Sequence, residues 1–277
     1  MIIDAHHHLW NPARGDYDWM PMDNPTLARA YAPGDYPIEE IDKTVLVQAA
    51  TTVEETEYML GLADATSWIA GVVGWVNFED EDQIATLMRL AAHPKFLGVR
   101  PMIQDIADDD WMLRDDVQWA FSALVDLDLC FDALGFPRHL TNFNTILSRY
   151  PGLRTVVDHC MKPNIAQHNA AAFDDWARGM AQLAERGAYC KLSGLITEAS
   201  SDWSISDLRP YAEKVISLFG AERVMWGSDW PVCCLAGSHT SWLQTAQNLT
   251  ADLSDKDRSA IFYQTASAFY RLEAATA

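Results

Sequence analysis

The amino-acid sequence predicts an α/β protein in which eight strands close into a single (β/α)8 barrel domain over residues 1–277. Short apolar runs rich in Val, Ile, Leu and aromatic residues recur along the chain, separated by amphipathic segments. Their spacing of about 25 to 40 residues is what one strand, one helix and two loops occupy. After the first run stands His6-His7-His8, where an open dinucleotide-binding sheet would carry a glycine-rich turn. These observations favour a closed barrel of the TIM type over an open sheet.

Eight apolar runs are the expected strands. They begin near Ile2, Lys43, Ile69, Phe96, Leu129, Arg154, Tyr189 and Arg223. Strands that alternate with helices form a parallel sheet. In a β/α barrel the side chains at the carboxyl ends of the strands converge on one open face, so we expect the chemistry to lie there.

Capping residues indicate where the helices between the strands begin and end. Thr52, followed by Glu54 and Glu55, is typical of an N-cap with an acidic first turn, and Ser254 begins the last helix in a similar way. Glycine commonly follows the last turn of a helix. The other expected helices cover residues 82–92, 171–186 and 210–219, and the last two end before Gly187 and Gly220.

The segment from about residue 10 to 37 differs from the rest of the chain. It is rich in Pro, Asp, Tyr and Trp and has no clear period. A loop this long in a compact domain usually has a function. We therefore expect it to fold over the active-site face as a lid or pocket wall. No second domain, linker or low-complexity tract is visible.

Charge and cysteine content restrict the partners. A formal net charge of −19 argues against nucleic acid and against an anionic membrane surface, because both need clustered Lys and Arg. The chain starts without a basic and apolar leader, and it has no apolar run long enough to cross a bilayer. Five scattered cysteines without C-x-x-C spacing indicate reduced thiols in a cytoplasmic protein. The expected partner is a small-molecule substrate, and formation of a homo-oligomer stays open.

The predicted strand ends bring histidines, an arginine and a carboxylate together. His6 and His8 end the first strand, and alternation places both on the same side. Arg100, His159 and Asp229 follow the fourth, sixth and eighth strands. Each of these residues alone is weak evidence, because a single H-x-H or a single buried histidine is more often structural. Their joint position favours one shared site, and imidazole with carboxylate is the ligand set that a zinc-like ion prefers.

Five motifs carry a resemblance to a known family. They are Asp4-Ala5-His6-x-His8 with Trp10, Leu97-Gly98-Val99-Arg100, Val157-Asp158-His159 with Lys162-Pro163, Lys191-Leu192-Ser193-Gly194-Leu195, and Gly227-Ser228-Asp229-Trp230-Pro231. The sequence resembles the amidohydrolase-2 family over essentially its whole length. Within it, the sequence is similar to the lactonase branch, which includes L-fuconolactone, L-rhamnonolactone and pyrone-dicarboxylate lactonases. The resemblance implies a β/α barrel with its site at the C-terminal face and Asp229 as the base that activates water.

The sequence departs from the metal-dependent members of this family. Those relatives supply a carboxylated lysine or a glutamate from strand four and often a histidine from strand five. Here strand four ends in Arg100, and strand five reads Cys130-Phe131-Asp132-Ala133-Leu134. Because a guanidinium repels a second cation, we expect one divalent, zinc-like ion at most, weakly bound or dispensable. The expected metal ligands are His6, His8, His159 and Asp229. Met161 stands where relatives often have glycine.

Ring opening of a sugar-derived aldonolactone is the predicted reaction. Ring opening needs an activated water, stabilisation of the carbonyl oxyanion and a proton for the leaving oxygen. Asp229 is the expected base, and the expected carbonyl-polarising groups are His6, His8 and His159. The expected substrate-binding residues are Arg100, Trp10 and Lys162. The competing interpretation of Arg100 is an ion pair inside the barrel.

Two alternative enzymatic functions are lactone isomerisation and non-oxidative decarboxylation, which the same superfamily contains. Decarboxylases usually keep the strand-five histidine that is absent here. A barrel that only binds a ligand is disfavoured because the histidines and the carboxylate are all present. Covalent catalysis is also disfavoured, because Ser193 and Ser228 lack a G-x-S-x-G elbow and Cys233 and Cys234 are expected to be packing residues.

Overall fold

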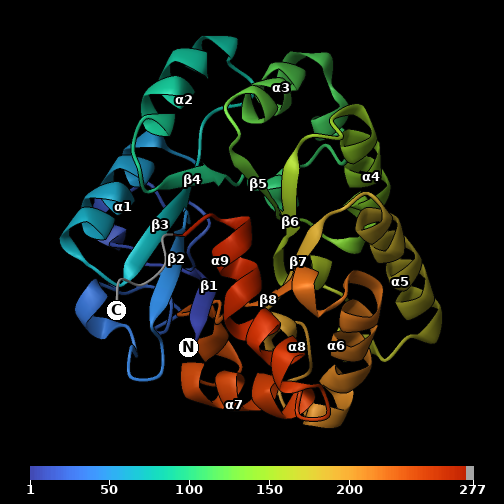
Figure 1. Cartoon of the computed structure of the whole chain (residues 1–277). Coiled ribbons are helices and arrows are strands. Elements are labelled where there is room, and N and C mark those ends of the chain that lie inside the picture. The colour runs from blue at the N-terminus through green and yellow to red at the C-terminus, as the bar shows by residue number, and fades with distance from the viewer. Residues whose placement is uncertain (273–277) are drawn as a thin grey trace.

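The computed structural model describes residues 1–272 of the chain. Its eight strands form one parallel sheet in which each strand pairs with its neighbours in sequence, from β1 to β8 (Figure 1). The strands are β1 (Ile3–His7), β2 (Lys43–Val47), β3 (Ile69–Gly74), β4 (Phe96–Val99), β5 (Cys130–Ala133), β6 (Arg154–Val157), β7 (Tyr189–Leu192) and β8 (Val224–Trp226). Each strand begins within one residue of its predicted start, and the predicted barrel is confirmed.

The barrel is closed by hydrogen bonds between β1 and the segment that follows β8. The backbone N–H of Asp229 donates to the carbonyl oxygen of His6 over 2.8 Å, and the N–H of His8 donates to the carbonyl oxygen of Trp230 over 2.7 Å. A parallel bridge also pairs His7 with Trp230. The seam of the barrel therefore runs through the residues that the sequence singles out for chemistry.

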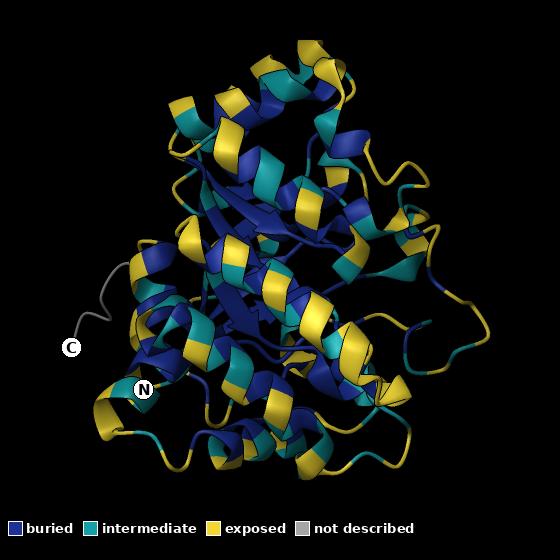
Figure 2. Cartoon of the chain, turned by 90° about the vertical axis from the view of Figure 1, so that its right-hand side faces the viewer, coloured by how far each residue is buried: buried dark blue, intermediate teal, exposed yellow. Residues whose placement is uncertain are grey.

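Helices surround the strands, with buried residues facing the barrel and exposed residues on the outside (Figures 1 and 2). They are α1 (Val53–Ala65), α2 (Ile84–Ala91), α3 (Gln118–Asp126), α4 (Leu140–Arg149), α5 (Ala170–Glu185), α6 (Ile205–Phe219), α7 (His239–Leu249), α8 (Asp255–Ser259) and α9 (Thr265–Phe269). As predicted, the Thr52 hydroxyl caps α1 by accepting from the N–H of Glu55. Within residues 1–272, no helix combines the length and apolarity needed to cross a membrane.

Two helix predictions need correction. Helix α6 begins at Ile205 and not at Pro210, because Ser204 and Asp207 form a capping box that starts the helix earlier. The last helix does start at the predicted Ser254 cap, but a π-helical turn at Ala260–Gln264 separates α8 from α9. Beyond this turn, apolar side chains of α9 and the residues after it pack against the inward-facing side chains of β1, β2, β3, β5, β6 and β8.

The segment 10–37 contains only two short 3-10 turns, at Pro12–Arg14 and Pro33–Asp35. Trp10 anchors it: the indole N–H donates to the carbonyl oxygen of Arg29 over 2.9 Å, and its ring makes an edge contact with Tyr31. Side chains of this segment also border the cavity at the carboxyl ends of the strands, as described below.

Candidate active site

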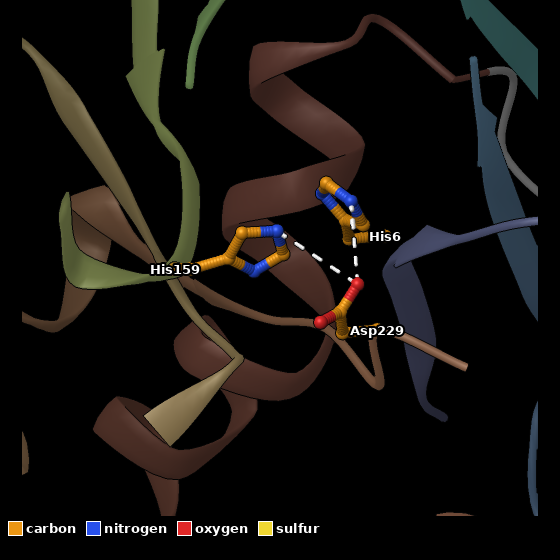
Figure 3. A group of neighbouring side chains, drawn as sticks. All are labelled: His6, His159 and Asp229. Carbon is orange, nitrogen blue, oxygen red and sulfur yellow. Dashed lines mark ion pairs between the residues drawn. The ribbon is translucent and has the colours of Figure 1, made fainter. Parts of the chain in front are cut away.

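The four predicted catalytic residues meet at the carboxyl ends of β1, β6 and β8. The Asp229 Oδ1 atom lies 3.3 Å from His8 Nε2, 3.8 Å from His6 Nε2 and 3.8 Å from His159 Nε2. Figure 3 shows His6 and His159 both turned toward the Asp229 carboxylate. All four residues are buried, and none exceeds 4% relative exposure. The structure thus gathers these residues in one place.

The second ring nitrogen of each histidine has its own partner. His8 Nδ1 lies 2.8 Å from the carbonyl oxygen of Val47, to which it donates, so the lone pair of the neutral ring is on Nε2. His159 Nδ1 lies 2.8 Å from the hydroxyl of Ser193. His6 Nδ1 instead lies 3.0 Å from the Nζ of Lys191, which can only donate. Each ring is therefore held in orientation by a contact outside the cluster.

Unusual backbone conformations place the side chains after β6 and β8. The four residues from His159 to Lys162 have φ between 47° and 60°, and Asp229 has φ of 56°. Residues other than glycine rarely adopt this left-handed region, and such positions cluster at functional sites. Met161 is one of them, with φ of 60°, a conformation that glycine adopts at lower steric cost.

Two glycines leave room for the histidines. A Cβ atom on Gly194, which has φ of +67°, would lie 2.7 Å from the Cβ of His159. A Cβ atom on Gly227 would lie 2.9 Å from the Cβ of His6. Glycine is thus required at both positions for the imidazoles to pack where they do.

Burial and neighbouring charges set the protonation states. Burial opposes ionisation of Asp229, but the nearby His159 and His8 outweigh it and hold the pKa of Asp229 below its usual value. Burial, only partly opposed by Asp229, holds the pKa of His159 well below its usual value. Burial and the adjacent Lys191 ammonium do the same to the pKa of His6. At neutral pH the cluster contains an ionised carboxylate facing neutral His6 and His159.

Beneath His6 lies a charged group that the sequence interpretation did not assign. Lys191 of β7 is completely buried, with its Nζ 2.5 Å from Asp132 of β5 and 3.0 Å from Asp158, which follows β6. Burial opposes protonation of Lys191, but the two carboxylates outweigh it and raise its pKa. A lysine inside the apolar run Tyr189–Leu192 is a signal that could have identified this group, because buried lysines need a partner.

A cavity of about 290 Å³ opens at this face of the barrel. Predicted site residues line it together with apolar side chains, several of them from the segment 10–37. The lining residues are His8, Trp10, Trp19, Leu27, Ala49, Arg100, Met102, Gln104, Asp105, Leu134, His159, Lys162, Asp229, Val232 and Leu235. A second cavity of about 390 Å³ adjoins it and shares Trp19, Met102 and Asp105. His6 is fully buried and is not among the lining residues.

The three predicted substrate-binding residues all line the 290 Å³ cavity. Arg100 donates to the backbone carbonyl of Gln48, and its Nη1 lies 3.5 Å from Asp158, so it both forms an ion pair and faces the cavity. Lys162 is half-buried, whereas Trp10 is fully buried and uses its N–H within the loop. Trp10 therefore acts as a wall of the cavity.

The hydroxyls and thiols that the sequence analysis set aside do not line this cavity. Ser193 is fully buried against His159 and orients that ring. The Ser228 hydroxyl donates to Asp4 over 2.5 Å. Cys233 and Cys234 are free thiols between two lining residues, Val232 and Leu235. None of the four is a lining residue of the cavity.

The donor set fits one divalent ion. The ligand atoms of His6, His159 and Asp229 lie within 4.8 Å of one another, and His8 Nε2 is 3.3 Å from the same carboxylate. Metal-bound histidines usually donate their other N–H to an oxygen acceptor. His8 and His159 have such an acceptor, whereas His6 has the Lys191 ammonium at that position. An ion here would thus be held by His6, His159 and Asp229, with His8 beside the same carboxylate and with the Lys191 ammonium weakening His6 as a ligand.

This fold and this site define a class, the β/α-barrel hydrolases with a histidine and aspartate cluster at the barrel mouth. The family profile described as amidohydrolase matches residues 3–272, so the chain belongs to the amidohydrolase family. The resemblance inferred from the sequence is confirmed.

Individual relatives are close to this chain over nearly their full lengths. L-fucono-1,5-lactonase from Burkholderia ambifaria is 41% identical, with 98% of this chain and 96% of the relative covered. L-fucono-1,5-lactonase from Burkholderia multivorans is 33% identical, with the same coverage. A crystal structure of an amidohydrolase from Burkholderia multivorans with bound zinc is 32% identical, covers 99% of this chain and 100% of that chain, and has a TM-score of 0.91.

Proposed function

We propose that this protein hydrolyses the lactone of a sugar-derived aldonic acid, with Asp229 as the base that activates water. The observation that carries the proposal is the position of the Asp229 carboxylate in the wall of a cavity that His8, His159, Arg100 and Lys162 also line. The names of the two Burkholderia relatives support a lactone substrate.

The reaction requires two proton transfers, and one carboxylate can perform both. Asp229 takes a proton from water as the water oxygen bonds to the lactone carbonyl carbon, and the carbonyl electron pair moves onto its oxygen. When the intermediate collapses, the ring C–O bond breaks and the protonated Asp229 returns the proton to the departing ring oxygen. The product is the open hydroxy acid. A low pKa keeps Asp229 ready as the ionised base at neutral pH.

Stabilisation of the oxyanion falls to the N–H groups beside Asp229. His159 lines the same cavity and can donate to an oxygen that becomes negative, and loss of such a donor typically costs about a hundredfold or more in rate. A divalent ion held by Asp229 and the histidines beside it would act as a Lewis acid on the same carbonyl when bound. Arg100 and Lys162 also suit the hydroxyl groups of an aldonolactone, which can accept their hydrogen bonds.

A pH-indicator assay with a panel of aldonolactones, including L-fucono-1,5-lactone, tests the proposal. We expect acid release on at least one sugar lactone, measured with and without a chelator. NMR of the product separates hydrolysis from isomerisation, since only hydrolysis gives the open acid. No turnover on any aldonolactone, or an isomeric lactone as the sole product, would overturn the assignment.

A further inference from the structure

A second group of metal-type ligands lies beneath the candidate active site, and a lysine side chain fills it. The ligand atoms of His6, Asp132 and Asp158 lie within 4.8 Å of one another, and all three side chains are fully buried. The Nζ of Lys191 is 3.0 Å from His6 Nδ1, 2.5 Å from Asp132 and 3.0 Å from Asp158. The ammonium therefore contacts every member of the group.

Charge balance explains why a cation belongs at this position. Two carboxylates buried at the barrel centre need compensation, because an unpaired buried charge is strongly destabilising. One imidazole and two carboxylates are also a donor set that zinc-like ions accept. The Lys191 ammonium forms hydrogen bonds with His6 and Asp132 and an ion pair with Asp158, so it compensates the charge of the group without a metal.

We propose that Lys191 is the resident cation of this second site and a positioning residue for His6. It excludes a divalent ion from His6, Asp132 and Asp158, and it keeps His6 Nδ1 as a hydrogen-bond acceptor. The neutral His6 ring then carries its proton on Nε2, the nitrogen that faces His8 and Asp229.

The neighbouring hydrogen bonds agree with this proton position. His6 Nε2 lies 3.2 Å from His8 Nε2, whose ring donates through Nδ1 to the carbonyl of Val47 and so offers a lone pair at Nε2. In this arrangement Lys191 donates to His6, His6 donates to His8, and His8 donates to the carbonyl of Val47. The competing arrangement places the proton on His6 Nδ1 and lets Arg100, whose Nη1 is 3.3 Å from His6 Nε2, donate instead.

The first experiment counts metal ions in chelator-stripped protein by calorimetric titration with zinc and by elemental analysis. We expect the wild type to bind one ion per chain at most and Lys191→Met to bind one more than the wild type. The matched control is the double variant Asp132→Asn/Lys191→Met, which loses a ligand together with the lysine and gains no ion. A wild type that takes two ions, or a folded Lys191→Met variant that gains none, would overturn the proposal.

The second experiment needs no variant at Lys191 and remains decisive if Lys191→Met does not fold. Proton–nitrogen correlation spectra of metal-free, ¹⁵N-histidine-labelled wild type distinguish the two tautomers of a neutral ring, and His6→Asn identifies the signals of His6. We expect the proton of His6 on Nε2, and a proton on Nδ1 would contradict the proposal. Neither readout uses lactone turnover, so an inactive protein with these properties counts against the proposed function and not against this inference.

Discussion

The backbone N–H of Asp229 donates to the carbonyl oxygen of His6 over 2.8 Å, and this bond is part of the seam that closes the barrel. The proposed base and the histidine beneath it are thus fixed to each other by main-chain atoms. Substitution of either side chain leaves this bond in place, so the side-chain chemistry of the site can be tested with little change in the fold.

Replacement of Gly194 by alanine tests whether the position of His159 matters. The added Cβ would lie 2.7 Å from the Cβ of His159, so the imidazole must shift. We expect lactone turnover to fall by about tenfold or more, since small displacements at a reacting centre are costly. The matched control is Gly187→Ala, which has a similar positive φ of +88° but nothing within 4 Å. Equal activity losses in the two variants would show that backbone strain, and not His159, is responsible.

Glu55 lies outside the candidate active site and predicts a pH dependence of the free energy of unfolding. Its buried carboxylate accepts from the N–H groups of Ala49 and Ala50 at the end of β2, and burial raises its pKa from 4.5 to about 7. A carboxyl whose pKa is raised on folding contributes stability at low pH that is lost as the pH rises from 4.5 through about 7. This loss amounts to about 3 kcal/mol for a shift of this size.

The corresponding test compares Glu55→Gln with Glu54→Gln, an exposed position in the same turn of α1. Denaturant unfolding is measured across this pH range. As the pH rises, the free energy of unfolding should fall less for Glu55→Gln than for the wild type. Glu54→Gln should follow the wild type. Parallel curves for Glu55→Gln and the wild type would refute the prediction.

Arg100 should act mainly in substrate binding. Because its guanidinium lines the cavity, Arg100→Met is expected to raise KM for an aldonolactone by about tenfold to a hundredfold, the range for charged hydrogen bonds. Arg100→Lys keeps the positive charge but loses the planar guanidinium that can donate two parallel hydrogen bonds, so an intermediate KM is expected. Steady-state kinetics decide the matter. A drop in kcat at constant KM would assign Arg100 to the transition state alone.

Local sequence patterns were sufficient to predict the barrel and the convergence of these side chains. Apolar runs and alternation are local properties, and in a parallel barrel they fix which side chains reach the open face. The sequence alone could therefore place His6, His8, His159 and Asp229 together, since they stand at three strand ends. The resemblance to amidohydrolases added the role of Asp229, which remains a prediction.

The pairing of Lys191 with Asp132 and Asp158 could not be predicted in the same way. Lys191 and Asp132 lie in β7 and β5 and Asp158 follows β6, and their contact depends on how far each side chain extends into the barrel. The start of α6 was misplaced for a different reason, because a proline in the second turn suggested a helix start that the Ser204 capping box overrides. Competing local signals of this kind are resolved only by the tertiary structure.

The central claim is that the Asp229 carboxylate activates water, and Asp229→Asn tests it most directly. The amide keeps the shape of the side chain and the backbone bond to His6 but cannot accept the proton. We expect kcat/KM on the best aldonolactone to fall by at least about a hundredfold, the usual scale for loss of a general base. The melting temperature should stay close to that of the wild type, and Asp175→Asn on the exposed face of α5 should keep full activity. An Asp229→Asn variant with most of the wild-type kcat/KM would contradict the account and assign water activation to another group.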